Sequence, residues 1–136
     1  MPVKKIKSIL LIEDDEITNF LNQTVIEETG LVDQIIVASN GMEGLAYLQS
    51  LSGPEAYPSL ILLDINMPVL DGFSFLEEFN KLSVAKEAAT RVVVLSTSTN
   101  ASDINQMQAL GIQRHLAKPL SEQDFREVVN ELPNPL

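Results

Sequence analysis

The chain of 136 residues has no cysteine and no tryptophan, only one histidine, and few aromatic residues (5%). Without cysteine, the chain has no disulfide framework, no thiolate metal site and no cysteine nucleophile. One histidine is too few for a His/Cys zinc site. The sparse aromatic residues also disfavour a stacking surface for single-stranded nucleic acid.

Basic residues are scarce as well. The chain has 9 Lys and Arg against 19 Asp and Glu, a formal net charge of −10, and its only basic cluster is Lys4, Lys5 and Lys7. Such a chain repels nucleic acid and anionic membranes. The longest apolar runs are too short for a signal peptide or a bilayer span. We therefore expect a soluble, cytoplasmic protein with neither nucleic acid nor membrane as a partner.

Apolar residues make up 45% of the chain, which is enough for a core. The length fits one domain over residues 1–136, with a core at about 7–132 and no output domain. Short apolar, β-branched runs predict strands, and three of them lack polar alternation, as in parallel strands covered on both faces. The predicted strands are Ser8–Glu13, Gln34–Ala38, Ser59–Asp64, Arg91–Ser96 and Arg114–Ala117.

Helical periodicity fills the segments between these strands. Stop signals follow the helical segments at Gly30, Gly53-Pro54, Gly111 and Pro133, and Ser121 with Asp124 resembles a capping box. The predicted core stripes are Ile17, Phe20, Leu21 and Val25; Met42, Leu45, Leu48 and Leu51; Phe75, Leu76, Phe79 and Leu82; Ile104, Met107 and Leu110; and Phe125, Val128, Val129 and Leu132. The pattern is (βα)₅, an α/β fold with one parallel sheet, helices on both faces and right-handed crossovers.

Polar residues follow four of the five predicted strands. Glu13-Asp14-Asp15 follows the first, Asp64 ends the third, Ser96-Thr97-Ser98 ends the fourth, and Lys118-Pro119 follows the fifth. Open α/β sheets bind ligands beyond the carboxyl ends of their strands. We therefore expect these groups to share one edge of the sheet.

Each of these groups also has a purely structural interpretation. Asp14, Asp15 and Glu16 suit the beginning of a helix, and Asp64 could bond to its own turn. Ser96 to Ser98 could be ordinary turn residues, and Lys118 could be one exposed lysine among several. Independent structural choices give no reason for acids, a hydroxyl and a lysine to meet at one edge, so the combination favours a functional site.

The chemistry of that combination is specific. Converging carboxylates raise one another's pKa unless a cation joins them, and an all-oxygen site suits Mg²⁺ or Mn²⁺. A carboxylate beside such a cation can attack phosphorus and form an acyl phosphate. Lys118 and Ser96 are suited to balancing the charge of the transferred group. Asp64 is therefore a candidate phosphoryl acceptor.

Four motifs support a family resemblance: LLIEDD, LLDINMPVLDG, VVVLSTS, and Lys118-Pro119 seven residues after Gly111. From Lys7 to Leu132 the chain resembles the response regulator receiver domains of two-component signalling, in particular the single-domain, chemotaxis-type receivers. The resemblance implies a flavodoxin-like doubly wound α/β fold with five parallel strands in the order 2-1-3-4-5.

The resemblance also implies roles for individual residues. Asp64 matches the phosphorylated aspartate, and Lys118 matches the lysine that pairs with it, followed by a bond that is cis in the family. Ser96 matches the switch hydroxyl, and Met67-Pro68 and Gly72 match the loop after the acceptor. The metal ligands implied are Asp14 directly, Glu13 assisting, Asp64, and the backbone carbonyl of Asn66.

The chain departs from the family pattern at two points. The acidic pair is Glu13-Asp14 rather than two aspartates, and Asp15 could compete for a ligand role. His115 stands where the family usually has a switch tyrosine or phenylalanine. His115 is therefore either a switch residue of unusual chemistry or a partly exposed strand residue.

The function implied is that of a stand-alone receiver. A sensor histidine kinase or a histidine phosphotransfer protein would donate the phosphoryl group to Asp64 with Mg²⁺, or Mn²⁺, present. Ser96 would then move inward and reshape the surface around the fourth helix, fifth strand and fifth helix, to which a downstream protein would bind. The chain would be a monomer, or a dimer when phosphorylated. It would not be an enzyme, apart from catalysing its own phosphorylation and slow dephosphorylation. Asn66 and Ser98 would tune the rate of dephosphorylation.

Three other functions are alternatives for this sequence. A receiver could serve as a docking unit that no longer uses phosphate, although every functional position is filled. A small Mg²⁺-dependent phosphatase commonly has a second acid two residues after its nucleophile, where this chain has Asn66. A flavin-binding module needs a phosphate-cradling loop after the first strand, where this chain has acids, and no G-x-G-x-x-G or Walker pattern is present.

Overall fold

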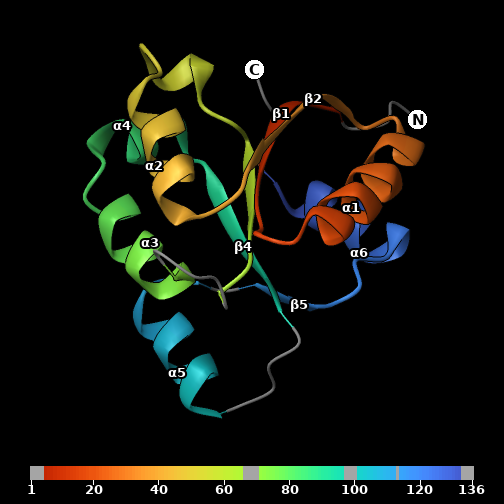
Figure 1. The fold of residues 1–136 in the computed structure, drawn as a ribbon. Coiled ribbons are helices and arrows are strands. Elements are labelled where there is room, and N and C mark those ends of the chain that lie inside the picture. Colours follow the sequence, from red (N-terminus) through yellow and green to blue (C-terminus); the bar gives the residue numbers. More distant parts are fainter. Residues whose placement is uncertain (1–4, 66–70, 97–100, 113, 133–136) are drawn as a thin grey trace.

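The structure, a computed structural model, describes residues 5–65, 71–96, 101–112 and 114–132. Five parallel strands form one sheet with helices on both faces (Figure 1). Their order is β2-β1-β3-β4-β5, so the predicted order 2-1-3-4-5 is confirmed. The strands are β1 (Ile6–Ile12), β2 (Val32–Ala38), β3 (Leu60–Leu63), β4 (Arg91–Ser96) and β5 (His115–Ala117).

The strand bounds differ from the predicted ones by at most two residues. β4 has the predicted bounds, β1 and β2 begin two residues earlier, β5 begins one residue later, and β3 is one residue shorter at each end. As a result, Glu13 and Asp64 lie one residue beyond β1 and β3 instead of within them. Both acids thus stand directly past the strand ends, at the carboxyl edge of the sheet.

All five predicted helices are present, together with two elements that the periodicity did not indicate. The third predicted stripe is divided, because α3 ends at Phe79 and Leu82 directly precedes a separate short helix, α4. A 3₁₀ turn, η1 (Pro54–Ala56), follows α2. The helices are α1 (Glu16–Thr29), α2 (Gly41–Gln49), α3 (Gly72–Phe79), α4 (Ser83–Ala88), α5 (Ala101–Ala109) and α6 (Glu122–Glu131).

Two apolar clusters cover the two faces of the sheet. Helices α2, α3, α4 and α5 lie on one side of the sheet, and α1 and α6 on the other (Figure 1). Leu10 and Ile12 of β1 belong to the first cluster, whereas Ile9 and Leu11 belong to the second. Successive strand residues point to opposite faces, so a strand covered on both sides must be apolar throughout. This explains the unbroken apolar runs of β1, β3 and β4.

The helix ends follow local chemistry. Asp15, Asn40, Asp71 and Ser121 each accept a backbone N–H bond as N-caps, so the predicted cap at Ser121 is confirmed. Gly30 ends α1 with φ +66°, a conformation that glycine adopts without strain. Within the described residues, no helix is both long and apolar enough to traverse a bilayer.

The predicted core face of α1 is wrong. Ile17, Phe20 and Leu21 are 71%, 68% and 53% exposed, and only Val25 of that stripe packs partly against the core. The face turned to the sheet instead presents Asn19, Asn22 and Ile26. On α2 the predicted stripe is right at Leu48, which is buried, and wrong at Met42, which is 59% exposed. Three exposed apolar side chains on one helix face form what we call the α1 apolar face: Ile17, Phe20 and Leu21.

Candidate phosphoryl-acceptor site

The sheet order gathers the predicted residues at one edge. Glu13 and Asp14 follow β1, Asp64 follows β3, Ser96 ends β4 and Lys118 follows β5. These four strands are consecutive neighbours in the sheet. All run in the same direction, so their carboxyl ends meet at one edge, where α/β proteins bind ligands.

Three carboxylates converge at this edge. One oxygen each from Glu13, Asp14 and Asp64 lies within 4.8 Å of the other two. Glu13 and Asp64 are buried, at 4% and 5% exposed, whereas Asp14 is exposed. The cluster thus has two buried acids on a rigid sheet and one acid open to solvent.

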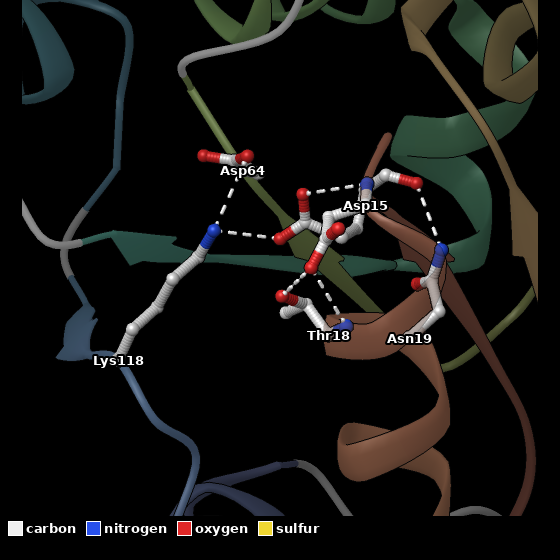
Figure 2. A network of polar contacts seen from close by, with 6 residues as sticks. Asp15, Thr18, Asn19, Asp64 and Lys118 are labelled. Atoms are coloured by element: carbon white, nitrogen blue, oxygen red, sulfur yellow. Dashed lines mark hydrogen bonds and ion pairs between the residues drawn. The ribbon is translucent and has the colours of Figure 1, made fainter.

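Lys118 joins the two buried acids. Its Nζ lies 2.6 Å from Oε1 of Glu13 and 3.2 Å from Oδ2 of Asp64 (Figure 2). The backbone N–H of Lys118 also donates to the carbonyl of Ser96, at 3.2 Å. The Lys118–Pro119 peptide bond is cis, as the resemblance predicts. The lysine is therefore held against both acids at the same time.

Burial and the crowding of acids change the protonation of this site. Burial, together with the neighbouring Asp64, raises the pKa of the Glu13 carboxyl to about 7, although Lys118 favours the charged form. Burial lowers the pKa of the Lys118 ammonium, but the hydrogen bond to Glu13 and the charge of Asp64 outweigh burial and raise it above its ordinary value. The site thus holds more negative charge than one ammonium can balance.

The donor set fits a small divalent cation. Mg²⁺ and Mn²⁺ prefer oxygen ligands and retain several waters, so two or three carboxylates with access to solvent suffice. Glu13, Asp14 and Asp64 provide such oxygens, and the exposed Asp14 leaves room for water. A divalent cation there would also offset the repulsion between the two buried acids. These three residues could hold the metal.

Asp15 is used in another way. Its carboxylate accepts hydrogen bonds from both the backbone N–H and the hydroxyl of Thr18, which makes Asp15 the N-cap of α1 (Figure 2). These two bonds hold the pKa of the Asp15 carboxyl below its ordinary value. Of the two uses left open for Asp15, helix capping is the one observed.

Ser96 and His115 lie on the same face of the sheet. Ser96 is 1% exposed and pairs with Ala117, while His115 is half-buried and pairs with Val94, two residues earlier in the same ladder. Nε2 of His115 is buried and has no hydrogen-bond partner among the described residues. This arrangement leaves the switch role of His115 a prediction.

The loop after Asp64 is described in part. Asn66, Met67-Pro68 and Ser98 lie outside the described residues. Gly72 opens α3, and its N–H donates to the carbonyl of Ile65 at 3.2 Å. A Cβ at Gly72 would lie 2.5 Å from Cα of Ile65, closer than backbone can tolerate. Glycine therefore allows α3 to start directly against the segment that holds Asp64.

One contributor to the site was missed in the sequence. Asn19 is buried in α1, and its Nδ2 donates to the carbonyl of Glu13 at 2.9 Å (Figure 2). The apolar stripe drew attention to the opposite face of this helix. The signal in the sequence is a pair of amides at Asn19 and Asn22, spaced so that both lie on the face opposite the apolar residues.

Comparison with known proteins places these features in one family. A family model for the response regulator receiver domain matches residues 9–130. Response regulator Rcp1 of Synechocystis sp. is 33% identical over 125 residues, which cover 90% of this chain and 84% of Rcp1. The Mn²⁺-bound form of Rcp1 has a TM-score of 0.74 at 31% identity, covering 96% of this chain and 99% of that one.

Two further solved structures are similar over most of the chain. A two-component response regulator from Cytophaga hutchinsonii has a TM-score of 0.84 at 32% identity, covering 94% of this chain and 97% of that one. The phosphorylated cyanobacterial phytochrome response regulator RcpA has a TM-score of 0.73 at 32% identity, covering 90% and 88%. With the sheet order and the acidic cluster, these matches show that the chain belongs to the response regulator receiver domains of two-component signalling.

Proposed function

We propose that this receiver accepts a phosphoryl group on Asp64 from a phosphohistidine donor. The observation that carries the proposal is the placement of Asp64, buried at the carboxyl edge beside Lys118 and within 4.8 Å of Glu13 and Asp14. Burying a carboxylate costs free energy, and the ion pair with Lys118 offsets part of that cost for Asp64. Two similar proteins support metal binding and phosphorylation at such a site, because Rcp1 has a solved Mn²⁺-bound form and RcpA has a solved phosphorylated form.

The residues divide the transfer between them. Glu13, Asp14 and Asp64 would hold Mg²⁺ or Mn²⁺, which when bound withdraws charge from the phosphoryl oxygens. An oxygen of Asp64 forms the new P–O bond while the P–N bond to the donor histidine breaks, and the electron pair of that bond stays on the imidazole nitrogen. Lys118 already lies 3.2 Å from Asp64, close enough to balance the charge of the acyl phosphate.

The output follows from the position of Ser96. Ser96 ends β4 beside β5, so movement of its hydroxyl toward a phosphoryl group on Asp64 would disturb the β4–β5 ladder and α5. Such a change is a population shift between two states, read by a downstream protein. His115 would take part in this conformational change because it lies in the β4–β5 ladder. Identical amide exchange across residues 104–112 and 114–125 with and without phosphorylation would contradict this part of the proposal.

The α1 apolar face offers the donor protein a contact surface next to Asp64. Asp15 caps α1 at the acidic site, and Ile17 is only two residues further on. Exposed apolar residues that cluster on one face are typical of protein-binding surfaces, whereas singly scattered ones are not. Exposed acids at Asp14, Asp15 and Glu16 border this face, so a donor with apolar anchors and a basic rim would fit. The proposal places the chain in the cytoplasm together with such a donor.

Intact-mass measurement tests the transfer. The protein is incubated with acetyl phosphate and Mg²⁺, with and without a chelator, beside the Asp64→Asn variant. We expect a gain of one phosphoryl group that needs Mg²⁺ and is absent in Asp64→Asn. A gain that persists in Asp64→Asn would show that another residue is the acceptor, and a gain that persists with chelator would contradict the metal requirement.

A further inference from the structure

The buried face of α1 contains two amides where apolar residues would be expected. Asn19 is 8% exposed and Asn22 is 5% exposed, and both lie on the same face as the fully buried Ile26. Burying an amide costs free energy unless its polar atoms are bonded. Oδ1 of Asn19 has no partner among the described residues, so only half of this amide is compensated. Packing alone therefore does not account for an asparagine at position 19.

The side-chain NH₂ group of Asn19 holds one particular peptide group, the one between Glu13 and Asp14. Its Nδ2 donates to the carbonyl of Glu13, at 2.9 Å (Figure 2). The N–H of Glu13 donates to Ala38, the last residue of β2, at 3.1 Å. Because β2 ends there, the Asn19 amide provides the donor that a further residue of β2 would give to this carbonyl.

The peptide group held in this way lies between the two adjacent acids of the site. The carbonyl of Glu13 and the N–H of Asp14 belong to one plane, so a bond to that carbonyl restrains the backbone from which both side chains depart. The next peptide is also held, because the N–H of Asp15 donates to Oε2 of Glu13 at 3.3 Å. With Glu13 fixed, its other oxygen reaches Lys118 at 2.6 Å.

We infer that Asn19 is a positioning residue for the acidic site, holding the Glu13–Asp14 peptide so that both carboxylates point at the same place. The inference rests on the proposed function. Groups that orient metal ligands without touching the metal typically change metal affinity by about 10- to 100-fold when they are removed. We expect a loss of this size when Asn19 loses its donor.

The chain provides a matched control. Asn22 is the same residue type, similarly buried, on the same helix face and about one turn further along α1 from the acidic site. Asn19→Leu and Asn22→Leu each replace an amide by an apolar group of similar size, which a buried helix face can accommodate. Both variants should therefore fold, and Asn19→Ala provides a second removal of the donor.

Three readouts separate positioning from a general structural role. Calorimetric titration with Mn²⁺ alone should show about 10- to 100-fold weaker binding in Asn19→Leu and Asn19→Ala, and binding within about twofold of the wild type in Asn22→Leu. Labelling by acetyl phosphate should need more Mg²⁺ for half-saturation in Asn19→Leu, yet reach the wild-type level at saturating Mg²⁺. Amide resonances of Asp14 and Asp15 in the metal-free protein should shift in Asn19→Leu and stay in place in Asn22→Leu.

The outcomes distinguish the inference from the function on which it rests. If the wild type binds Mn²⁺ and is phosphorylated while Asn19→Leu binds Mn²⁺ as tightly, the inference is wrong and the function stands. Equal losses in Asn19→Leu and Asn22→Leu would also overturn the inference, because they would show a general effect of the helix. If the wild type binds no Mn²⁺, the metal part of the proposed function and the inference both fall.

Discussion

Helices α1 and α3 look alike in sequence and pack in opposite ways. Each begins with an aspartate that caps its first turn, and each contains closely spaced large apolar residues. In α3, Phe75 is 0% exposed and stacks against Phe79 with ring centroids 5.9 Å apart. In α1, Phe20 is 68% exposed, and the apolar residues around it face solvent.

The difference shows what a helix at a functional edge has to provide. Both helices begin next to an acid of the site, α3 through Gly72 against Ile65, and α1 through Asn19 against Glu13. At that segment the polar contact that α3 makes is the backbone N–H of Gly72 donating to Ile65, so the inner face of α3 can be apolar. α1 holds a carbonyl with a side chain, so its inner face contains amides and its apolar residues lie outside, where a partner can reach them.

The largest expected effect separates the two phenylalanines. Phe75→Ala should lower the free energy of unfolding by about 3–5 kcal/mol, because the cavity lies in a packed core. Phe20→Ala should change it by less than about 0.5 kcal/mol, since Phe20 is already exposed. Urea unfolding of both variants measures the difference. A similar loss in the two would mean that α1 packs with its apolar face inward.

A second prediction concerns Glu13, whose backbone carbonyl is held by Asn19 of α1. The pKa of Glu13 is raised from 4.5 to about 7, so the folded, metal-free protein keeps a proton that the unfolded chain releases over that range. The resulting stability is fully present below the unfolded pKa and is lost as the pH rises through about 7. Urea unfolding between about pH 5 and pH 8 should show a falling free energy for the wild type that is absent in Glu13→Gln.

The same proton should oppose metal binding. Below about pH 7, Mn²⁺ affinity of the wild type should fall by up to tenfold per pH unit, because the ligand set must lose a proton. Calorimetric titration at several pH values measures this slope. A slope of equal size in Glu13→Gln would assign the titration to a different group.

The exposed face of α1 gives a fourth prediction. Phe20→Ser should slow transfer about tenfold from any phosphohistidine protein that phosphorylates the wild type, because a central aromatic anchor of the contact is lost. The rate with acetyl phosphate, which needs no docking, should be unchanged. Met42→Ser, at an exposed position of α2, is the control and should affect neither rate. Equal rates for Phe20→Ser and wild type with every protein donor would remove this face from the proposal.

The smallest expected effect concerns a feature in which the two helices agree. Asp15 accepts from Thr18 N–H at 2.9 Å, and Asp71 accepts from Ser74 N–H at 2.8 Å. Asp15→Ala and Asp71→Ala should each lower the free energy of unfolding by about 1 kcal/mol. Asp15→Ala should leave Mn²⁺ affinity nearly unchanged, whereas a large loss would make Asp15 a ligand.

The sequence was sufficient for the sheet and for the cluster of acids. Unbroken apolar runs identify strands covered on both faces, and the charged residues that follow them must meet at one edge. Which face of α1 packs against the sheet could not be predicted. Apolar residues on a helix indicate its core face only if they do not serve instead to bind another protein. The role of Asn19 could not be predicted either, since its hydrogen bond to the carbonyl of Glu13 depends on how closely α1 packs against the end of β1.

The most direct test of the central claim is to identify the residue that becomes phosphorylated. The protein is phosphorylated with acetyl phosphate and Mg²⁺, then treated with borohydride, which reduces an acyl phosphate to an alcohol, and the peptides are sequenced by mass spectrometry. We expect conversion of Asp64 to homoserine, dependent on Mg²⁺. Conversion at Glu13 or Asp14 with Asp64 unchanged would contradict it.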